Sequence, residues 1–136
     1  MEPEPFVDDE MEPDADLKRV TNAIIGAAIE VHRRLGPGYS EITYKNALEL
    51  EFKHRGVRSS REHHIYVMYR DQIVGEGWLD FLVEDAVIVE VKVAESLAPI
   101  HTAQVISYLR ATRFKLALII TFNVRLLKDG IKRVSL

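Results

Sequence analysis

The chain has no cysteine among its 136 residues. That absence excludes disulfide bonds, thiolate zinc sites and cysteine-held iron–sulfur clusters. No apolar run approaches the roughly 20 residues of a membrane-spanning helix, and the acidic first segment lacks the basic and apolar regions of a signal peptide. Glycine-rich phosphate loops and nucleophile elbows are also missing. The expectation is a soluble cytoplasmic protein that does not enter a membrane.

Charge is distributed unevenly along the chain. The net charge is −3, but residues 1–17 carry eight acidic side chains, no basic ones and three prolines. The rest of the chain keeps 18 basic against 13 acidic side chains, which is a net charge of +5. Because an acidic, proline-rich segment buries too little apolar surface to fold, we predict a disordered tail over residues 1–17 and one folded domain over 18–136. The tail is either a solubilising segment or a mimic of a nucleic-acid strand that covers a basic groove.

Hydrophobic periodicity predicts an α/β fold. Three strands in succession are joined by short loops as antiparallel hairpins, and a third helix then crosses over to a strand that lies parallel to the sheet. The element order is α-α-β-β-β-α-β, with a possible extra edge strand at the C-terminus. The predicted helices cover 17–35, about 40–56 and 99–112, and the strands cover 61–69, 72–83, 87–93, 116–122 and, at the edge, 131–136.

Three polar residues stand where this pattern calls for apolar ones. Glu90 and Lys92 interrupt a β-branched run typical of a strand buried on both faces, and burying them costs free energy that packing does not return. Asp80 lies on the preceding strand. A three-residue loop over 84–86, or a two-residue loop with a bulge, places Asp80 opposite Glu90, whereas a plain two-residue loop places it on the other face. Asp85 tolerates the left-handed conformation that such loops need.

Two carboxylates and a lysine in this arrangement suit a divalent cation beside an activated water. A structural ion pair is the alternative, although such pairs seldom stabilise a fold relative to apolar residues. A mixed sheet that carries a carboxylate hairpin near its middle and is flanked by helices predicts a restriction-endonuclease-like core. Trp78 and Phe81 flank Asp80 and are expected to pack in the core, with base stacking as the alternative.

Further motifs occur in a fixed order along the chain. Residues 38–44 fit Gly-x-x-Glu-x-x-Tyr, Asp80 precedes Glu90-Val91-Lys92, and residues 104–108 fit Gln-x-x-x-Tyr. With these motifs, residues from about 20 to 134 resemble the GxxExxY proteins, a family within the PD-(D/E)xK nuclease superfamily. The resemblance implies a metal-dependent nuclease that hydrolyses phosphodiester bonds.

The resemblance also implies a cofactor, partners and roles for individual residues. The ion would be magnesium, with manganese as a substitute, and the substrate would be nucleic acid. The resemblance does not separate DNA from RNA; our expectation is DNA in preference to RNA, and a homodimer would join two weakly basic surfaces. The alternative is a catalytically inactive module of the same fold that binds nucleic acid or a protein partner. Glu41, Asp80, Glu90 and the Val91 carbonyl would hold the metal, Lys92 would orient or deprotonate the attacking water, and Gln104, Tyr108 and Tyr44 would bind substrate or surrounding waters.

Overall fold

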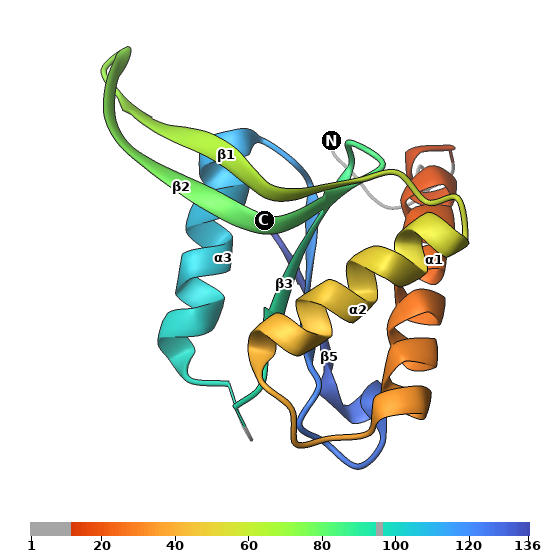
Figure 1. The fold of residues 1–136 in the computed structure, drawn as a ribbon. Coiled ribbons are helices and arrows are strands. Elements are labelled where there is room, and N and C mark those ends of the chain that lie inside the picture. Colours follow the sequence, from red (N-terminus) through yellow and green to blue (C-terminus); the bar gives the residue numbers. More distant parts are fainter. Residues whose placement is uncertain (1–11, 95–96) are drawn as a thin grey trace.

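The structure is a computed structural model that describes residues 12–94 and 97–136. Its elements follow the predicted order, with an added 3-10 turn and the expected C-terminal edge strand (Figure 1). They are α1 (Glu12–Leu35), α2 (Glu41–His54), β1 (Ser59–Tyr69), β2 (Gln72–Val83), β3 (Val87–Lys92), α3 (Pro99–Thr112), β4 (Leu116–Thr121), η1 (Leu127–Gly130) and β5 (Ile131–Ser135).

The five strands form one mixed sheet in the order β1-β2-β3-β4-β5. β3 and β4 are parallel, while the other neighbouring pairs are antiparallel. The parallel pair follows from the α3 crossover, because a strand that returns through a helix enters the sheet in the same direction. The predicted α/β fold with a restriction-endonuclease-like sheet is confirmed.

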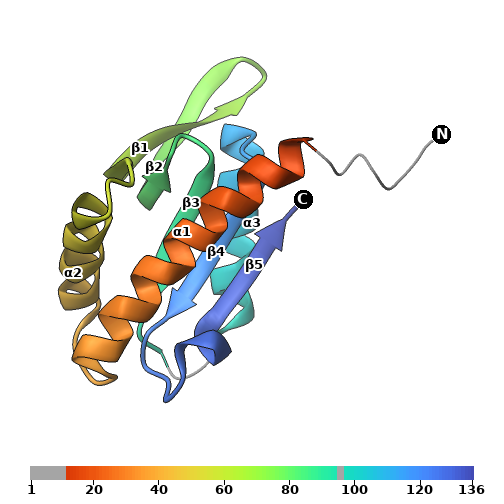
Figure 2. The same ribbon diagram turned by 90° about the vertical axis from the view of Figure 1, so that its right-hand side faces the viewer.

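Helices cover both faces of the sheet (Figure 2). α1 and α2 pack on one face, where Val89 and Val91 of β3 join their apolar side chains. α3 packs on the other face against a second cluster that includes Ile88. β3 is therefore buried on both faces, as its β-branched sequence predicts. Among the described residues, no helix has the length and apolar character needed to cross a lipid bilayer.

The observed helix boundaries change one predicted limit. α1 begins at Glu12 rather than at residue 17, so the last part of the predicted disordered tail belongs to this helix. The remainder of that prediction, residues 1–11, lies outside the described residues. The helix accordingly includes residues 12–17, six residues that charge and proline content had assigned to the tail.

The β1–β2 hairpin projects past the rest of the sheet (Figure 1). Its turn is the predicted Arg70–Asp71 pair, and both residues have positive φ, at 49° and 65°. Two left-handed residues in succession suit the right-handed twist of a two-residue hairpin loop. We refer to the projecting part, residues 64–78, as the hairpin arm.

Candidate active site

A three-residue loop sets the register between β2 and β3. The pairs Phe81–Val89 and Val83–Val87 leave residues 84–86 as the loop, which is one of the two arrangements predicted to align Asp80 with Glu90. Asp85 is left-handed as expected, with φ of 52°, and Glu84 is left-handed as well, with φ of 53°. The Glu84 carboxylate accepts a hydrogen bond from the backbone N–H of Arg58 at 2.8 Å, which anchors the loop to the segment before β1.

β2 and β3 separate directly after the Phe81–Val89 pair, and the carboxylates of Asp80 and Glu90 bridge the gap. We refer to this point of separation, with Asp80 and Glu90, as the fork. The Asp80 N–H donates to Glu90 Oε2 at 2.8 Å, and the Val91 N–H donates to Asp80 Oδ2 at 2.8 Å. Each carboxylate thus takes the place of a backbone carbonyl that would otherwise satisfy these donors. Asp80 and Glu90 are buried, with 8% and 3% of their surface exposed.

Burial of two neighbouring acids affects their ionisation. Burial, together with the charge of Asp80, raises the pKa of Glu90 to about 8. The positive charges of Lys92 and Lys45 act in the opposite direction without cancelling this effect. Glu90 therefore retains its proton near neutral pH unless further positive charge is brought to the carboxylates.

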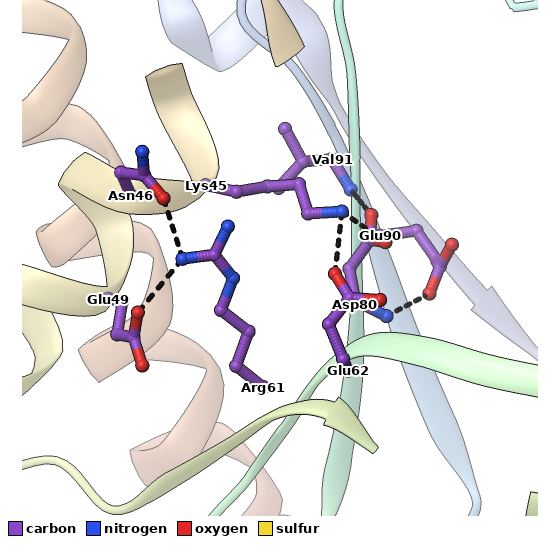
Figure 3. A network of polar contacts seen from close by, with 8 residues as sticks. All are labelled: Lys45, Asn46, Glu49, Arg61, Glu62, Asp80, Glu90 and Val91. Carbon is purple, nitrogen blue, oxygen red and sulfur yellow. Dashed lines mark hydrogen bonds and ion pairs between the residues drawn. The ribbon is translucent and has the colours of Figure 1, made fainter. Parts of the chain in front are cut away.

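Lys45 of α2 is the site residue that sequence reasoning missed (Figure 3). Its Nζ lies 3.1 Å from Asp80 Oδ1 and 2.8 Å from Glu62 Oε2. Burial disfavours the charged amine, but the hydrogen bond to Glu62 and the charge of Asp80 outweigh it and raise the pKa of Lys45. One signal was available, because Lys45 lies four residues after Glu41 and shares its helix face.

The Gly-x-x-Glu-x-x-Tyr motif is split between two environments. Glu41 is partly buried at the start of α2, on the same face as Lys45. Tyr44 is fully buried and stacks on Phe122 with ring centroids 4.5 Å apart. Its hydroxyl donates to the Gly36 carbonyl and accepts from the Tyr39 N–H at 3.2 Å. Tyr44 thus fixes the loop that leads into α2.

The described residues contain no group of three histidine, cysteine, aspartate or glutamate side chains placed to hold one metal ion. Asp80 and Glu90 are brought together, but Glu41 does not form such a group with them. The ammonium of Lys45 occupies the side of Asp80 that faces α2.

The helical Gln-x-x-x-Tyr motif lies on α3. The Tyr108 ring packs over β2 so closely that a methyl group on Gly77 would lie 3.3 Å from Tyr108 Cε1. Burial, followed by the charges of Glu90 and Asp80, raises the pKa of the Tyr108 hydroxyl. Gln104, one turn earlier, is exposed, and Lys92 is partly exposed.

Trp78 differs from the expectation of core packing. Phe81 is fully buried as predicted, but half of the Trp78 surface is exposed. The indole ring stacks on His64, its cross-strand partner on β1. The expectation failed because an aromatic residue on a strand is buried only where another element covers its face. α2 contacts β1 at Arg61 and Glu62, before the hairpin arm begins (Figure 3).

The mixed sheet and its carboxylate-bridged fork define a restriction-endonuclease-like protein. A sequence model of the PD-(D/E)XK nuclease superfamily matches residues 18–134, and the chain belongs to this superfamily. No curated protein gives a significant match to the chain. Membership of the narrower GxxExxY family remains a prediction.

Proposed function

We propose that the protein is a metal-dependent nuclease that hydrolyses phosphodiester bonds of nucleic acid. The observation that carries this proposal is the pair of buried carboxylates of Asp80 and Glu90, each hydrogen-bonded to the backbone of the opposite strand where β2 and β3 separate. Burying two acids side by side costs free energy. Membership of a nuclease superfamily supplies a chemical reason for that cost.

The residues at the fork fit a hard divalent cation. Magnesium takes oxygen ligands and keeps several waters, so two carboxylates and a backbone carbonyl are sufficient protein ligands. Burial and the charge of Asp80 raise the pKa of Glu90, and a bound cation would offset both effects by favouring the ionised carboxylate. Asp80, Glu90 and the Val91 carbonyl would hold magnesium or manganese, and Glu41 would reach it through water. The bound ion would polarise the phosphate and lower the pKa of a water ligand.

The remaining side chains would act on the phosphate and on the attacking water. Lys92 lies within the field of Glu90, where its ammonium would orient the water and stabilise charge on the phosphate oxygens. Tyr108 reaches the same region from α3, and exposed Gln104 extends that surface by one turn. Tyr44 contributes indirectly, because it fixes the loop that positions Glu41.

We further propose that the substrate is DNA in preference to RNA and that the protein acts as a homodimer in the cytoplasm. Residues 18–136 carry a net charge of +5, which is modest for a nucleic-acid groove on one subunit. Two copies would combine two weakly basic surfaces on one substrate.

The second candidate is a module of the same fold that binds nucleic acid or a protein partner without cutting. The contact between Lys45 Nζ and Asp80 Oδ1 favours it, because an ammonium already neutralises a carboxylate that the metal would need. In an active nuclease, a cation would have to compete with Lys45 for this oxygen.

The experiment that separates the two candidates uses the purified full chain and a panel of labelled DNA and RNA, single-stranded, duplex and branched. Each substrate is incubated with magnesium, with manganese and with a chelator. We expect metal-dependent cleavage that falls by at least about a hundredfold in Lys92→Ala and in Glu90→Gln.

Lys53→Ala is the matched control, because Lys53 is an exposed lysine in the last turn of α2. It should cleave like the wild type. Binding without cleavage under all conditions would select the module, and equal cleavage by Lys92→Ala and the wild type would contradict the proposed site.

A further inference from the structure

The hairpin arm carries an exposed group of aromatic rings that the proposed chemistry does not use. His64 and Trp78 are cross-strand partners whose ring centroids lie 5.0 Å apart at an interplanar angle of 29°. Tyr66 meets the His64 ring edge-on at 4.7 Å. Trp78 and Tyr66 are about half exposed, at 50% and 51%. We refer to His64, Tyr66 and Trp78 as the aromatic platform.

Contacts within the arm hold the platform in shape. His64 Nε2 lies 2.6 Å from Glu76 Oε1, which fixes the imidazole against the indole. The Trp78 ring is therefore preordered by one neighbour while half of its surface stays in solvent. Contiguous exposed apolar groups of this kind mark binding surfaces more often than isolated ones do.

The platform lies on the strand that carries Asp80 and faces the same side. Leu79 points into the cluster under α3, so strand alternation turns Trp78 to the opposite face. On that face Lys45 of α2 contacts Asp80. Two residues along a β-strand span roughly 6–7 Å. This length is comparable with the span of one nucleotide in an extended nucleic-acid strand. A nucleic-acid strand with its scissile phosphate at Asp80 would bring a neighbouring base to the indole.

Resting on the nuclease function proposed above, we propose that the aromatic platform stacks an unpaired base beside the scissile phosphate. The substrate class is then single-stranded or locally unpaired nucleic acid. In a duplex each base is covered by its neighbours in the stack, so an indole gains a base face only where pairing is absent or broken. Stacking on an aromatic side chain tolerates any base. The platform therefore distinguishes unpaired from paired nucleic acid and does not recognise base sequence.

The test uses the fluorescence of Trp78, the one tryptophan in the chain. Full-length protein carrying Asp80→Asn, which removes a proposed catalytic carboxylate, is titrated with a single-stranded oligonucleotide and with the same sequence as a duplex. We expect the single strand to quench the tryptophan emission and the duplex to leave it nearly unchanged.

Binding is measured in parallel by anisotropy of a labelled single strand. In the same Asp80→Asn background, Trp78→Ala should bind roughly ten- to a hundredfold more weakly, and Trp78→Phe should retain most of the affinity. Leu50→Ala is the control, because Leu50 is an apolar side chain on α2 with 67% of its surface exposed. It should bind like the parent protein.

The outcomes distinguish this proposal from the nuclease function. Quenching by single strands with no cleavage by the wild-type protein would support the platform and reject the nuclease. Metal-dependent cleavage with equal quenching by both nucleic acids, or with unchanged affinity in Trp78→Ala, would reject the platform alone. Sedimentation of the same variants tests whether a second copy of the chain, rather than nucleic acid, binds the platform. A dimer that Trp78→Ala dissociates, without quenching by nucleic acid, would also overturn the proposal.

Discussion

At the scale of single residues, the carboxylate of Asp80 is shared between a strand and a helix. One oxygen accepts the Val91 N–H from β3, and the other contacts the Lys45 ammonium from α2. The side chains of Asp80 and Lys45 are each only 12% exposed, so solvent screens this pair weakly. Glu62 adds a second acid on the exposed side of the lysine. Lys45 therefore offsets part of the negative charge that the sheet fork concentrates.

Lys45→Met should lower the free energy of unfolding at pH 7 by about 3 kcal/mol, because it leaves the buried Asp80 carboxylate without its cation. The double variant Lys45→Met with Asp80→Asn should recover a large part of that loss, since neither charge then remains unpaired. Chemical denaturation of the wild type, both single variants and the double variant measures the coupling. Lys53→Met is the control and should change stability by less than about 1 kcal/mol. Strictly additive losses would show that the pair contributes nothing to stability.

At the scale of elements, the start of α2 is fixed by the residue that ends the Gly-x-x-Glu-x-x-Tyr motif. Tyr44 reaches from the first turn of the helix back to Gly36 and Tyr39, while its ring stacks on Phe122 after β4. The loop, the helix start and the sheet are thereby joined by one side chain. The motif spacing then has a structural reason, because Glu41 and Tyr44 lie one turn apart.

Tyr44→Phe should lower the free energy of unfolding by about 1–2 kcal/mol, because it keeps the stacked ring and removes the partner of the Gly36 carbonyl and the Tyr39 N–H. Tyr39→Phe is the matched control. Its side chain is 52% exposed and should change stability by less than about 0.5 kcal/mol. Thermal or denaturant unfolding gives both values. Unchanged stability in Tyr44→Phe, together with lost cleavage, would instead assign its hydroxyl a direct role at the substrate.

At the scale of the whole molecule, the fork lies where helices from opposite faces of the sheet meet the same pair of strands. α2 supplies Lys45 from one side, and α3 supplies Tyr108 from the other. The hairpin arm extends away from this point (Figure 1). Its exposed side chains include those of the aromatic platform. The residues proposed to bind metal and substrate therefore come from several elements, and β2 carries both Asp80 and Trp78.

Magnesium or manganese should raise the melting temperature of the wild-type protein, because a ligand bound only by the folded state stabilises it by mass action. Asp80→Asn and Glu90→Gln should each abolish most of this rise, and Lys53→Ala should preserve it. Differential scanning calorimetry with metal and with chelator provides the measurement. An equal rise in all variants would place the ion elsewhere, with the acidic residues of positions 1–17 as the first alternative.

The local pattern was sufficient to predict the elements and to limit the carboxylate register to two possibilities. The β-branched run of β3 predicted a strand buried on both faces, and the same run made Glu90 and Lys92 conspicuous as polar interruptions. Strand parity identified the loop lengths that would align Asp80 with Glu90, and the observed pairing has one of them. These features are readable because alternation along a strand and spacing along a helix repeat over a few residues.

Three features were decided only by the tertiary structure. Lys45 joins the carboxylates, Tyr44 anchors the loop before α2, and Trp78 remains exposed. In each case the environment comes from an element distant in sequence, namely β2 for Lys45, the segment after β4 for Tyr44, and the uncovered face of the arm for Trp78. Periodicity indicates which residues share a face. Only packing between elements determines what, if anything, covers that face, because the partner is chosen by the geometry of the whole fold rather than by neighbouring residues.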